Sequence, residues 1–225
     1  MTRLWRVDLH CHTWFSWDGL SSPEAVIAMA RRQGLDRLAI TDHNTIAGAQ
    51  AAQRLAPDLI IVGEEVSTDR GELLAYYVQE EVPGNLPLYE ALHRLRAQGC
   101  IVSVPHPFDR YRRNSAVGRE TLLQIVHQVD AIEVFNSRCL CSTDNRRAAE
   151  VAQEFGLPGT AGSDAHAAIE VGRSGLELPP FHDAESFRYS LQEARPVGRL
   201  SSPGVHAYSL YARWRNDLRA RRLFP

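Results

Sequence analysis

Short apolar runs rich in β-branched residues alternate with helical patterns along almost the whole chain. Each apolar run has the length of a buried strand, and the segments between them carry apolar residues at helical spacing. Strands are predicted at residues 7–10, 38–41, 59–68, 73–78, 101–104, 131–135 and 159–162. Helices are predicted from residue 23 and over about 45–55, 87–98, 118–129, 143–155 and 205–223. Strands joined mostly by helices indicate an α/β, barrel-like domain with a parallel core.

Local signals fix the ends of some elements. Ser22 is a typical N-cap, Pro23 suits the first position of a helix, and Gly34 closes that helix. The strands at 59–68 and 73–78 are separated by only a few residues around Asp69-Arg70-Gly71, which predicts a hairpin.

The composition is that of an ordinary globular domain, and its charge limits the partners. The formal net charge is −2, which excludes the global basic field of non-specific nucleic-acid binders. All 25 basic residues are arginine, so an anion must be held by guanidinium groups, backbone N–H groups or metal ions. We expect one barrel domain over residues 1–225, in which residues 198–225 form a helical tail packed on the barrel.

Four scattered cysteines are too few for a disulfide framework and favour a reduced, cytoplasmic setting. The N-terminus runs into a strand pattern without a signal-peptide core. Uninterrupted apolar stretches of about 18 residues are lacking, so no membrane association is expected.

Side chains of metal-ligand type collect where the predicted strands end. They are His10 and His12, Asp42 and His43, Glu64 and Glu65, His106, and Asp164 and His166. Because the carboxyl ends of the strands of an α/β barrel share one face, these groups should meet at one mouth. Side chains two residues apart in extended backbone point the same way, so His10 and His12 can grip one ion. Asp42 and His43 point to opposite sides, and only one of them should be a direct ligand.

Imidazole together with carboxylate suits Mn, Fe or Zn, and the lack of cysteine at these positions argues against a structural zinc site. The remaining histidines are assigned to structural or surface roles, and two of them lie within predicted helices. They are His93, His127, His182 and His206.

At this point the chain resembles a known family. The motifs, which span about residues 7–170 in family order, are Asp8-Leu9-His10-Cys11-His12-Thr13, Ser16-Trp17-Asp18-Gly19, Thr41-Asp42-His43-Asn44, Gly63-Glu64-Glu65-Val66-Ser67, Pro105-His106-Pro107 and Gly162-Ser163-Asp164-Ala165-His166. Together they are similar to those of the PHP (polymerase and histidinol phosphatase) domain family, in its small stand-alone form. The resemblance implies a distorted seven-stranded (β/α) barrel, similar to a TIM barrel, that binds two or three divalent ions (Mn, Zn or Fe).

The resemblance also implies a ligand set. One metal would be held by His10, His12, Glu65 and Asp164. A second would be held by Asp18, His43 and His166. Glu65 would bridge to a third ion that is also bound by His106.

Many relatives supply one more histidine on the strand after Glu65, and here Glu72 takes that position. A carboxylate can ligate these metals. If Asp69 and Arg70 form a two-residue turn, Glu65 and Glu72 share a face of the hairpin, whereas a shift by one residue separates them.

These features predict a metal-dependent phosphoesterase in which a metal-bridging hydroxide attacks the phosphate. Asp164 and His43 are the predicted catalytic metal ligands, and Asp42 could orient a ligand imidazole. Arg138, just after a strand, is the first candidate for neutralising the charge of the phosphate. It is therefore predicted to be both a substrate-binding and a catalytic residue. Further candidates on the same rim are Arg110, Arg112 and Arg113.

The expected substrate is a nucleotide or another small phosphomonoester. Trp14, beside Phe15 and Trp17, could stack on a nucleobase or could pack the first loop against the barrel. Three alternatives stay open: a metal-dependent hydrolase of another bond, similar to an amidohydrolase; an exonuclease on nucleic-acid ends; and a metal-binding module without turnover. A nucleic-acid partner is compatible with the chain but not required by it.

Overall fold

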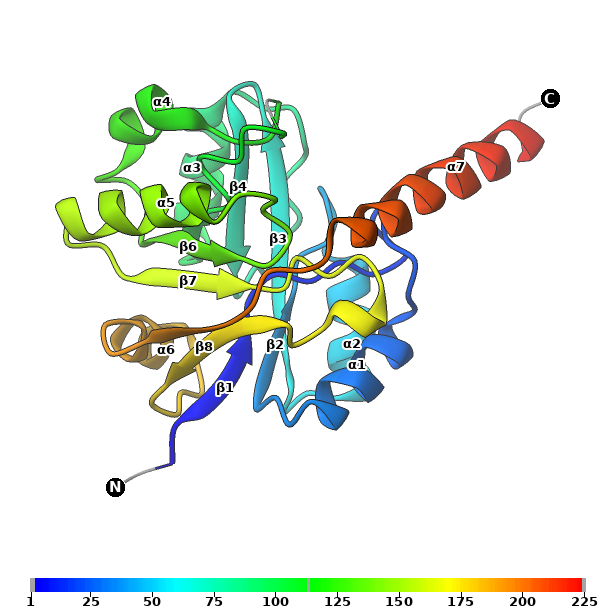
Figure 1. Ribbon diagram of the computed structural model, residues 1–225, viewed down its shortest axis with the longest axis horizontal. Helices are drawn as coiled ribbons and strands as arrows, with labels where there is room; N and C mark the ends of the chain where they lie inside the picture. The colour runs from blue at the N-terminus through cyan, green and yellow to red at the C-terminus, as the bar shows by residue number, and fades with distance from the viewer. Residues whose placement is uncertain (1–2, 113, 224–225) are drawn as a thin grey trace.

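The computed structural model describes residues 3–112 and 114–223 and shows one nine-stranded mixed sheet with helices packed around it (Figure 1). The strands are β1 (Trp5–Asp8), β2 (Arg37–Ile40), β3 (Ile60–Thr68), β4 (Gly71–Tyr76), β5 (Ile101–Val104), β6 (Ala131–Asn136), β7 (Gly159–Gly162), β8 (Ser174–Leu178) and β9 (Arg195–Gly198). The helices are α1 (Pro23–Arg32), α2 (Ala47–Leu55), α3 (Leu88–Ala97), α4 (Gly118–Ile125), α5 (Ser142–Glu154), α6 (Ala184–Leu191) and α7 (His206–Leu223). Two short 3₁₀ helices are η1 (Ala168–Glu170) and η2 (Pro203–Val205).

The strand order is β7-β6-β5-β4-β3-β2-β1-β8-β9. β1, β2 and β3 run parallel, as do β5, β6 and β7, whereas β4 is antiparallel to both of its neighbours. Where β1 ends, the chain meets β7: the Leu9 N–H donates to Ala161 O at 3.3 Å, and the Asp164 N–H donates to His10 O at 2.8 Å. These bonds nearly close the sheet into a barrel, which confirms the predicted fold class.

Each predicted strand and helix is present, with ends displaced by a few residues, but the predicted seven-strand count was too low. β8 and β9 extend the sheet beyond β1, and both pair antiparallel to their neighbours. β8 (Ser-Gly-Leu-Glu-Leu) has a glutamate between its two leucines, and β9 (Arg-Pro-Val-Gly) contains a proline, so neither has the continuous apolar run by which most other strands were recognised. α6 was not predicted either.

The capping signals act as expected at α1. The Ser22 side chain accepts a hydrogen bond from the Ala25 N–H at 3.3 Å. Gly34 ends the helical region with φ 67°, a left-handed conformation that costs glycine little.

Strand residues alternate between two apolar clusters. Leu38 and Ile40 pack with the surrounding helices, whereas Ala39 between them faces the barrel interior. At one end of the interior, Phe187 of α6 packs edge-on against Tyr76, with ring centroids 5.8 Å apart. Tyr76 pairs with Ile101 at the start of β5, so α6 covers the amino end of the barrel and leaves the carboxyl end for a site.

α7 begins against the carboxyl end of the barrel and then projects beyond the body (Figure 1). Ser209 and Ala212 are buried, whereas Tyr211 and Trp214 on the same helix are exposed. The organisation as one domain, residues 1–225 with a tail from residue 198, remains our proposal.

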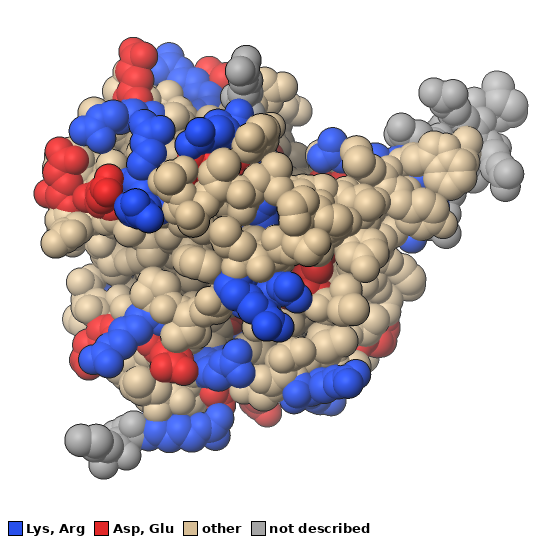
Figure 2. Space-filling model, viewed as in Figure 1, with Lys and Arg blue, Asp and Glu red and all other residues tan. Residues whose placement is uncertain are grey.

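The described residues add three general observations. All four cysteines are free thiols. Within residues 3–112 and 114–223, none of the helices combines the length and the hydropathy needed to cross a membrane. Arginine and acidic side chains are intermixed over the face shown in Figure 2, in accord with the formal net charge of −2.

Candidate metal centre

The structure brings all nine predicted metal ligands together at the carboxyl end of the barrel, although they come from positions 10 to 166. They form four overlapping groups, and within each group one nitrogen or oxygen atom per residue lies within 4.8 Å of the others. The groups are His12, Asp18, His43 and His166; His10, Glu65 and His106; His10, His12 and Asp164; and His43, Glu65 and Glu72. Their roles as ligands remain a prediction that this geometry supports.

His10 and His12 follow β1 and converge on the same acceptors. Their Nε2 atoms are 3.1 Å apart, and each lies 3.3 Å from one oxygen of Glu65. The Asp164 Oδ1 atom lies 3.7 Å from His10 Nε2 and 3.5 Å from His12 Nε2. The two imidazoles thus converge on the same side, as the His-x-His spacing predicted, and together with the two carboxylates they provide donor atoms suited to a divalent cation.

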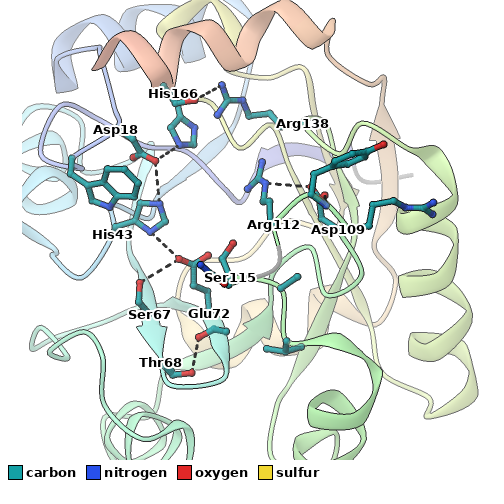
Figure 3. A pocket seen from close by; sticks show the side chains of 18 of the residues that line it. Asp18, His43, Ser67, Thr68, Glu72, Asp109, Arg112, Ser115, Arg138 and His166 are labelled. Carbon is teal, nitrogen blue, oxygen red and sulfur yellow. Dashed lines mark hydrogen bonds and ion pairs between the residues drawn. The ribbon is translucent and has the colours of Figure 1, made fainter. Parts of the chain in front are cut away.

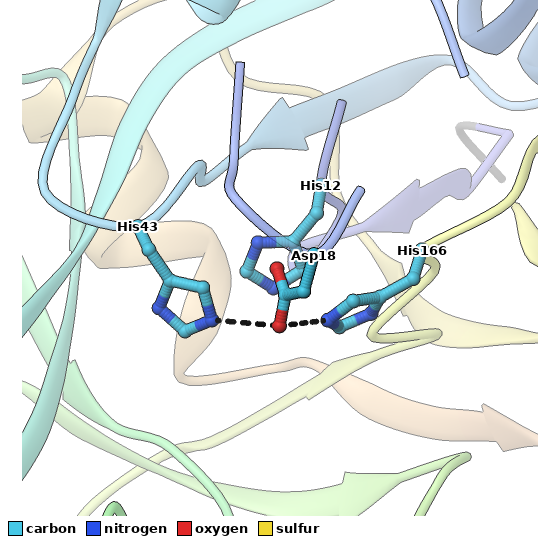
Figure 4. Close-up of side chains that lie close together, drawn as sticks. All are labelled: His12, Asp18, His43 and His166. Carbon is cyan, nitrogen blue, oxygen red and sulfur yellow. Dashed lines mark hydrogen bonds and ion pairs between the residues drawn. The ribbon is translucent and has the colours of Figure 1, made fainter. Parts of the chain in front are cut away.

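A second group surrounds Asp18, on the loop between β1 and α1 (Figure 4). The Asp18 Oδ2 atom lies 3.1 Å from His166 Nε2 and 3.6 Å from His43 Nε2. The His12 ring lies against both rings, with centroids 4.4 Å from that of His166 and 4.7 Å from that of His43. The Ser16 hydroxyl donates to the other Asp18 oxygen at 3.0 Å and so fixes the carboxylate plane.

The hairpin register decides the place of Glu72. Thr68 pairs with Gly71, which leaves Asp69 and Arg70 as a two-residue turn, and Ser67 pairs with Glu72. Glu72 therefore faces the same side as Glu65, which is the first of the two registers considered above.

Glu65 and Glu72 enclose His43 and His106 from two sides. His106 Nε2 lies 3.2 Å from Glu65 Oε1 and 3.9 Å from Glu72 Oε2. His43 Nδ1 lies 3.3 Å from Glu65 Oε2 and 3.6 Å from Glu72 Oε1.

The electrostatics of the cluster suit a bound cation. Burial alone would raise the pKa of Asp18 and of Asp164. The pKa of Asp18 is nevertheless held well below its usual value by His166 and His43, and that of Asp164 by Arg112 and His10. The carboxylates are therefore anionic at neutral pH.

Two buried atoms that face other proposed ligands lack a hydrogen-bond partner. They are His43 Nδ1 and Asp164 Oδ1. Because unpartnered buried polar atoms are costly, this donor set fits divalent ions that would satisfy it.

Two of the predicted ligands hold strained backbone. His106 has φ 27° and Asp164 has φ 53°, both in the left-handed region that is costly for residues other than glycine. The His106 N–H donates to Glu133 at 2.8 Å, and the Asp164 N–H donates to His10 O at 2.8 Å. These bonds hold the strained conformations in place.

Glu133 is a site residue that the sequence reading missed. It lies on β6, and its Oε1 atom is 3.0 Å from His10 Nδ1, which orients that imidazole. Its other oxygen accepts hydrogen bonds from the His106 N–H and from Asn136 Nδ2 at 2.8 and 3.0 Å. A single acidic residue within the apolar run of a buried strand was the available signal.

Asp42 was expected to orient a ligand imidazole, but it binds Thr13 instead. Its two oxygens accept from the Thr13 N–H at 2.6 Å and from the Thr13 hydroxyl at 2.7 Å. Asp42 thus anchors the first loop, and of the pair Asp42 and His43 only His43 belongs to the ligand groups.

The metal-ligand groups border an open cavity of about 1460 Å³. Asp18, His43, His166 and Glu72 lie on one side of it, and Arg112 and Asp109 on another (Figure 3). The cavity is large enough for a nucleotide-sized ligand.

The arginines near this cavity differ in what they already bind. Arg112 reaches the cluster, with Nη2 2.5 Å from Asp164 Oδ2 and Nε 3.3 Å from Asp109. Arg110 lines the cavity and pairs with Asp144 at 2.7 Å.

Arg138, the first candidate for phosphate binding, also lines the cavity, but its buried side chain already pairs with protein groups. Its Nε atom lies 3.1 Å from Glu170, and its Nη2 atom donates to Val205 O at 2.7 Å and to Ser209 at 3.1 Å. Arg113 lies outside the described residues.

The aromatic side chains of the first loop differ in whether they line the cavity. Trp14 is 51% exposed and is absent from the cavity lining, whereas Trp17 lines the cavity. The Trp17 ring stacks on the His43 ring at 5.6 Å with 28° between the planes.

An α/β barrel that gathers imidazole and carboxylate groups at the carboxyl ends of its strands has the architecture of a metal-dependent hydrolase. The family model described as PHP domain matches residues 8–155, and the model described as PHP-associated matches residues 142–196. The chain belongs to the PHP domain family.

Several known proteins are similar to this chain, and three of them are given as examples. An uncharacterized protein of Methanocaldococcus jannaschii is 37% identical over 175 residues, which cover 77% of this chain and 70% of that protein. A 5′-3′ exoribonuclease of Haemophilus influenzae is 42% identical over 67 residues, 28% of this chain and 24% of that protein.

The third is a crystal structure of a two-domain protein from Bacteroides vulgatus, described as containing a predicted PHP-like metal-dependent phosphoesterase. It superposes with a TM-score of 0.72 at 17% identity and covers 93% of this chain and 70% of that chain. At this identity the likeness shows the shared fold.

Proposed function

We propose that the chain hydrolyses a phosphate ester with two or three divalent ions held by the nine residues of the four groups. The observation that carries the proposal is the convergence of buried carboxylates and imidazoles, with His43 Nδ1 and Asp164 Oδ1 unpartnered, beside an open, arginine-bordered cavity. Bound divalent ions would supply Lewis-acid polarisation of the phosphate and activation of a water molecule.

The protein's own side chains have separate tasks in this proposal. His10, His12, Glu65 and Asp164 would hold one ion, and Glu133 fixes the ring of His10 by accepting its Nδ1–H. A second ion falls to Asp18, His43 and His166, and a third to Glu65, His106 and Glu72. Imidazole and carboxylate ligands suit Mn, Zn or Fe.

Arg112 is the arginine best placed to bind a phosphate oxygen, because it already lies beside Asp164 at the cavity wall. We assign it the role first predicted for Arg138, whose guanidinium is enclosed by Glu170 and the start of α7. Arg110 borders the outer cavity and can contact a more distant anionic group.

A nucleotide or another small phosphoester is the proposed substrate, because the cavity volume suits it. The short likeness to an exoribonuclease favours one second candidate, the removal of nucleotides from an RNA end.

A substrate panel with Mn²⁺, Zn²⁺ or Fe²⁺ tests the proposal. It contains p-nitrophenyl phosphate, the corresponding diester, nucleotides, a 5′-phosphorylated RNA oligonucleotide and an anilide. We expect metal-dependent turnover of a phosphoester, and a fall of at least about 100-fold in Asp164→Asn with the fold retained. Turnover of the anilide alone would indicate an amidohydrolase. A fully metal-loaded chain inactive on the whole panel would indicate a binding module.

Two arginine variants distinguish a role in phosphate binding from a role in stabilising the fold. Arg112→Ala should lower kcat/KM roughly 100-fold. Arg138→Ala should mainly lower the free energy of unfolding, by about 3–5 kcal/mol, because Glu170 is left buried and unpaired. The reverse pattern of kinetics and stability would return the phosphate-binding role to Arg138.

A further inference from the structure

α7 lies outside both segments that match the family models, which end at residues 155 and 196. Side chains of α7 nevertheless contact the loop between β1 and α1 that delivers Asp18. This loop, residues 9–22, is here called the Asp18 loop.

Two side chains of α7 bind the backbone on either side of Asp18. The Asn216 amide donates to Trp17 O at 2.8 Å, and Arg215 Nη2 donates to Gly19 O at 3.2 Å. The carbonyl groups of the two residues that flank Asp18 are thus both bound by one turn of α7. Gly19 lies directly against Thr13, so that an added Cβ would clash with Thr13 O.

Arg213 of α7 contacts the side chains of Trp17 and Asp18 in the same loop. Its guanidinium carbon lies 4.2 Å from the centre of the Trp17 ring, and its Nη2 atom lies 3.6 Å from Asp18 Oδ2. Trp17 in turn stacks on His43. A continuous stack therefore runs from α7 through the Asp18 loop to a second proposed ligand.

The start of α7 is tied to the third proposed ligand of the same group. Arg138 donates to Val205 O and to the Ser209 hydroxyl, and it pairs with Glu170. Glu170 also accepts the His166 N–H at 3.1 Å. The position of α7 is thereby fixed relative to His166 as well as to Asp18 and His43.

We propose that α7 is a clamp that positions the Asp18 loop and thereby sets the affinity for the divalent ion at the His12, Asp18, His43 and His166 group. Arg215 and Asn216 are positioning residues, which act on the ion through Asp18. The inference rests on the metal centre of the proposed function. Because free loops lose conformational entropy when they bind an ion, a loop already held in place binds it more tightly.

The test uses the full chain, stripped with a chelator and titrated with Mn²⁺ by calorimetry, with the bound metal counted after gel filtration. The variant is Arg215→Ala with Asn216→Asp, since aspartate has the shape of asparagine but cannot donate to Trp17 O. We expect about tenfold weaker binding of one Mn²⁺ ion, with the other ions unchanged. Tyr211→Ala, on the exposed side of α7, is the matched control and should bind as the wild type does.

A double-mutant cycle shows whether the effect passes through Asp18. When Asp18→Asn already removes the ligand, the two α7 substitutions should cause no further loss of Mn²⁺ affinity. Arg215→Lys, which keeps a donor for Gly19 O, should recover part of the affinity. Equal losses with and without Asp18 would overturn the clamp and indicate a general effect on stability.

Because the experiment measures metal binding and not catalytic turnover, failure of the clamp can be distinguished from failure of the proposed function. Unchanged Mn²⁺ affinity in the α7 variant, beside normal binding by the wild type, refutes the clamp and leaves the proposed function standing. A wild-type chain that binds no divalent ion refutes the proposed function and the clamp together.

Discussion

Adjacent glutamates on β3 show how a single residue's environment decides its chemistry. Glu65 faces the metal centre, where His10 and His43 overcome the effect of burial and hold its pKa well below the usual value. Glu64 faces the other way, and burial followed by the charge of Glu81 raises its pKa to about 8, although the Val82 N–H donates to it at 3.0 Å. Identical side chains one position apart thus have opposite shifts.

The raised pKa of Glu64 makes stability depend on pH. Because the folded-state pKa lies above the unfolded value near 4.5, the contribution of this carboxyl is complete below about pH 4.5 and is lost as the pH rises through about 8. The free energy of unfolding should fall by up to about 1.4 kcal/mol per pH unit across this window. Glu64→Gln should flatten that slope in urea titrations of chelator-treated protein at pH 5 to 8.

The exposed Glu193 is the control, because Glu193→Gln should keep the wild-type slope. A Glu64→Gln chain with an unchanged slope would show that the buried carboxyl is not the titrating group.

At the scale of an element, alternate residues of the β3–β4 hairpin point to opposite sides, so that one face carries proposed metal ligands and the other packs under the helices. Glu72 faces the centre, and Leu73 beside it is fully buried in the apolar cluster under the helices. Burial, and then the like charge of Glu65, raise the pKa of Glu72, so its carboxylate is repelled until a cation is bound.

Substitutions at these two neighbours should therefore have opposite effects. Glu72→Gln should weaken the binding of one ion while leaving or raising the melting temperature of the metal-free chain, since a repulsion is removed. Leu73→Ala should lower the free energy of unfolding by about 2–5 kcal/mol and leave the metal count unchanged. Metal analysis and thermal unfolding measure both, and a full metal count in Glu72→Gln would remove Glu72 from the ligand set.

At the scale of the whole molecule, the proposed ligands tie together segments from both halves of the barrel. His10 and His12 follow β1, whereas Asp164 and His166 follow β7, and the two strands meet where the sheet closes. Bound ions would therefore stabilise the closure of the barrel as well as the site.

Metal removal should accordingly lower the melting temperature. At a metal concentration of 100 times Kd, one ion contributes about 2.7 kcal/mol, which corresponds to a shift of roughly 5–10 °C for a domain of this size. Calorimetric scans with chelator and with increasing Mn²⁺ measure this, and Asp164→Asn should show a smaller shift. A melting temperature independent of Mn²⁺ would argue against ions bound to the folded state.

The sequence by itself determined the order of the strands and helices up to β7 and the set of nine residues that the structure brings together. For the residues at the ends of parallel strands it could do so because strand and helix periods are local, and because parallel strands deliver their ends to one face. Asp18 and Glu72 entered the set through the resemblance to the PHP family. The His10 and His12 spacing and the Asp69-Arg70 turn are examples of such local information.

Only the tertiary structure shows what each arginine already binds and what supports the proposed ligands. Arg112 and Arg138 look alike in the sequence, but one lies beside Asp164 and the other is enclosed by Glu170 and α7. Glu133 and the contacts of Asn216 with the Asp18 loop join positions more than 100 residues apart. Such contacts follow from how the packed elements meet in space, and no local period encodes them.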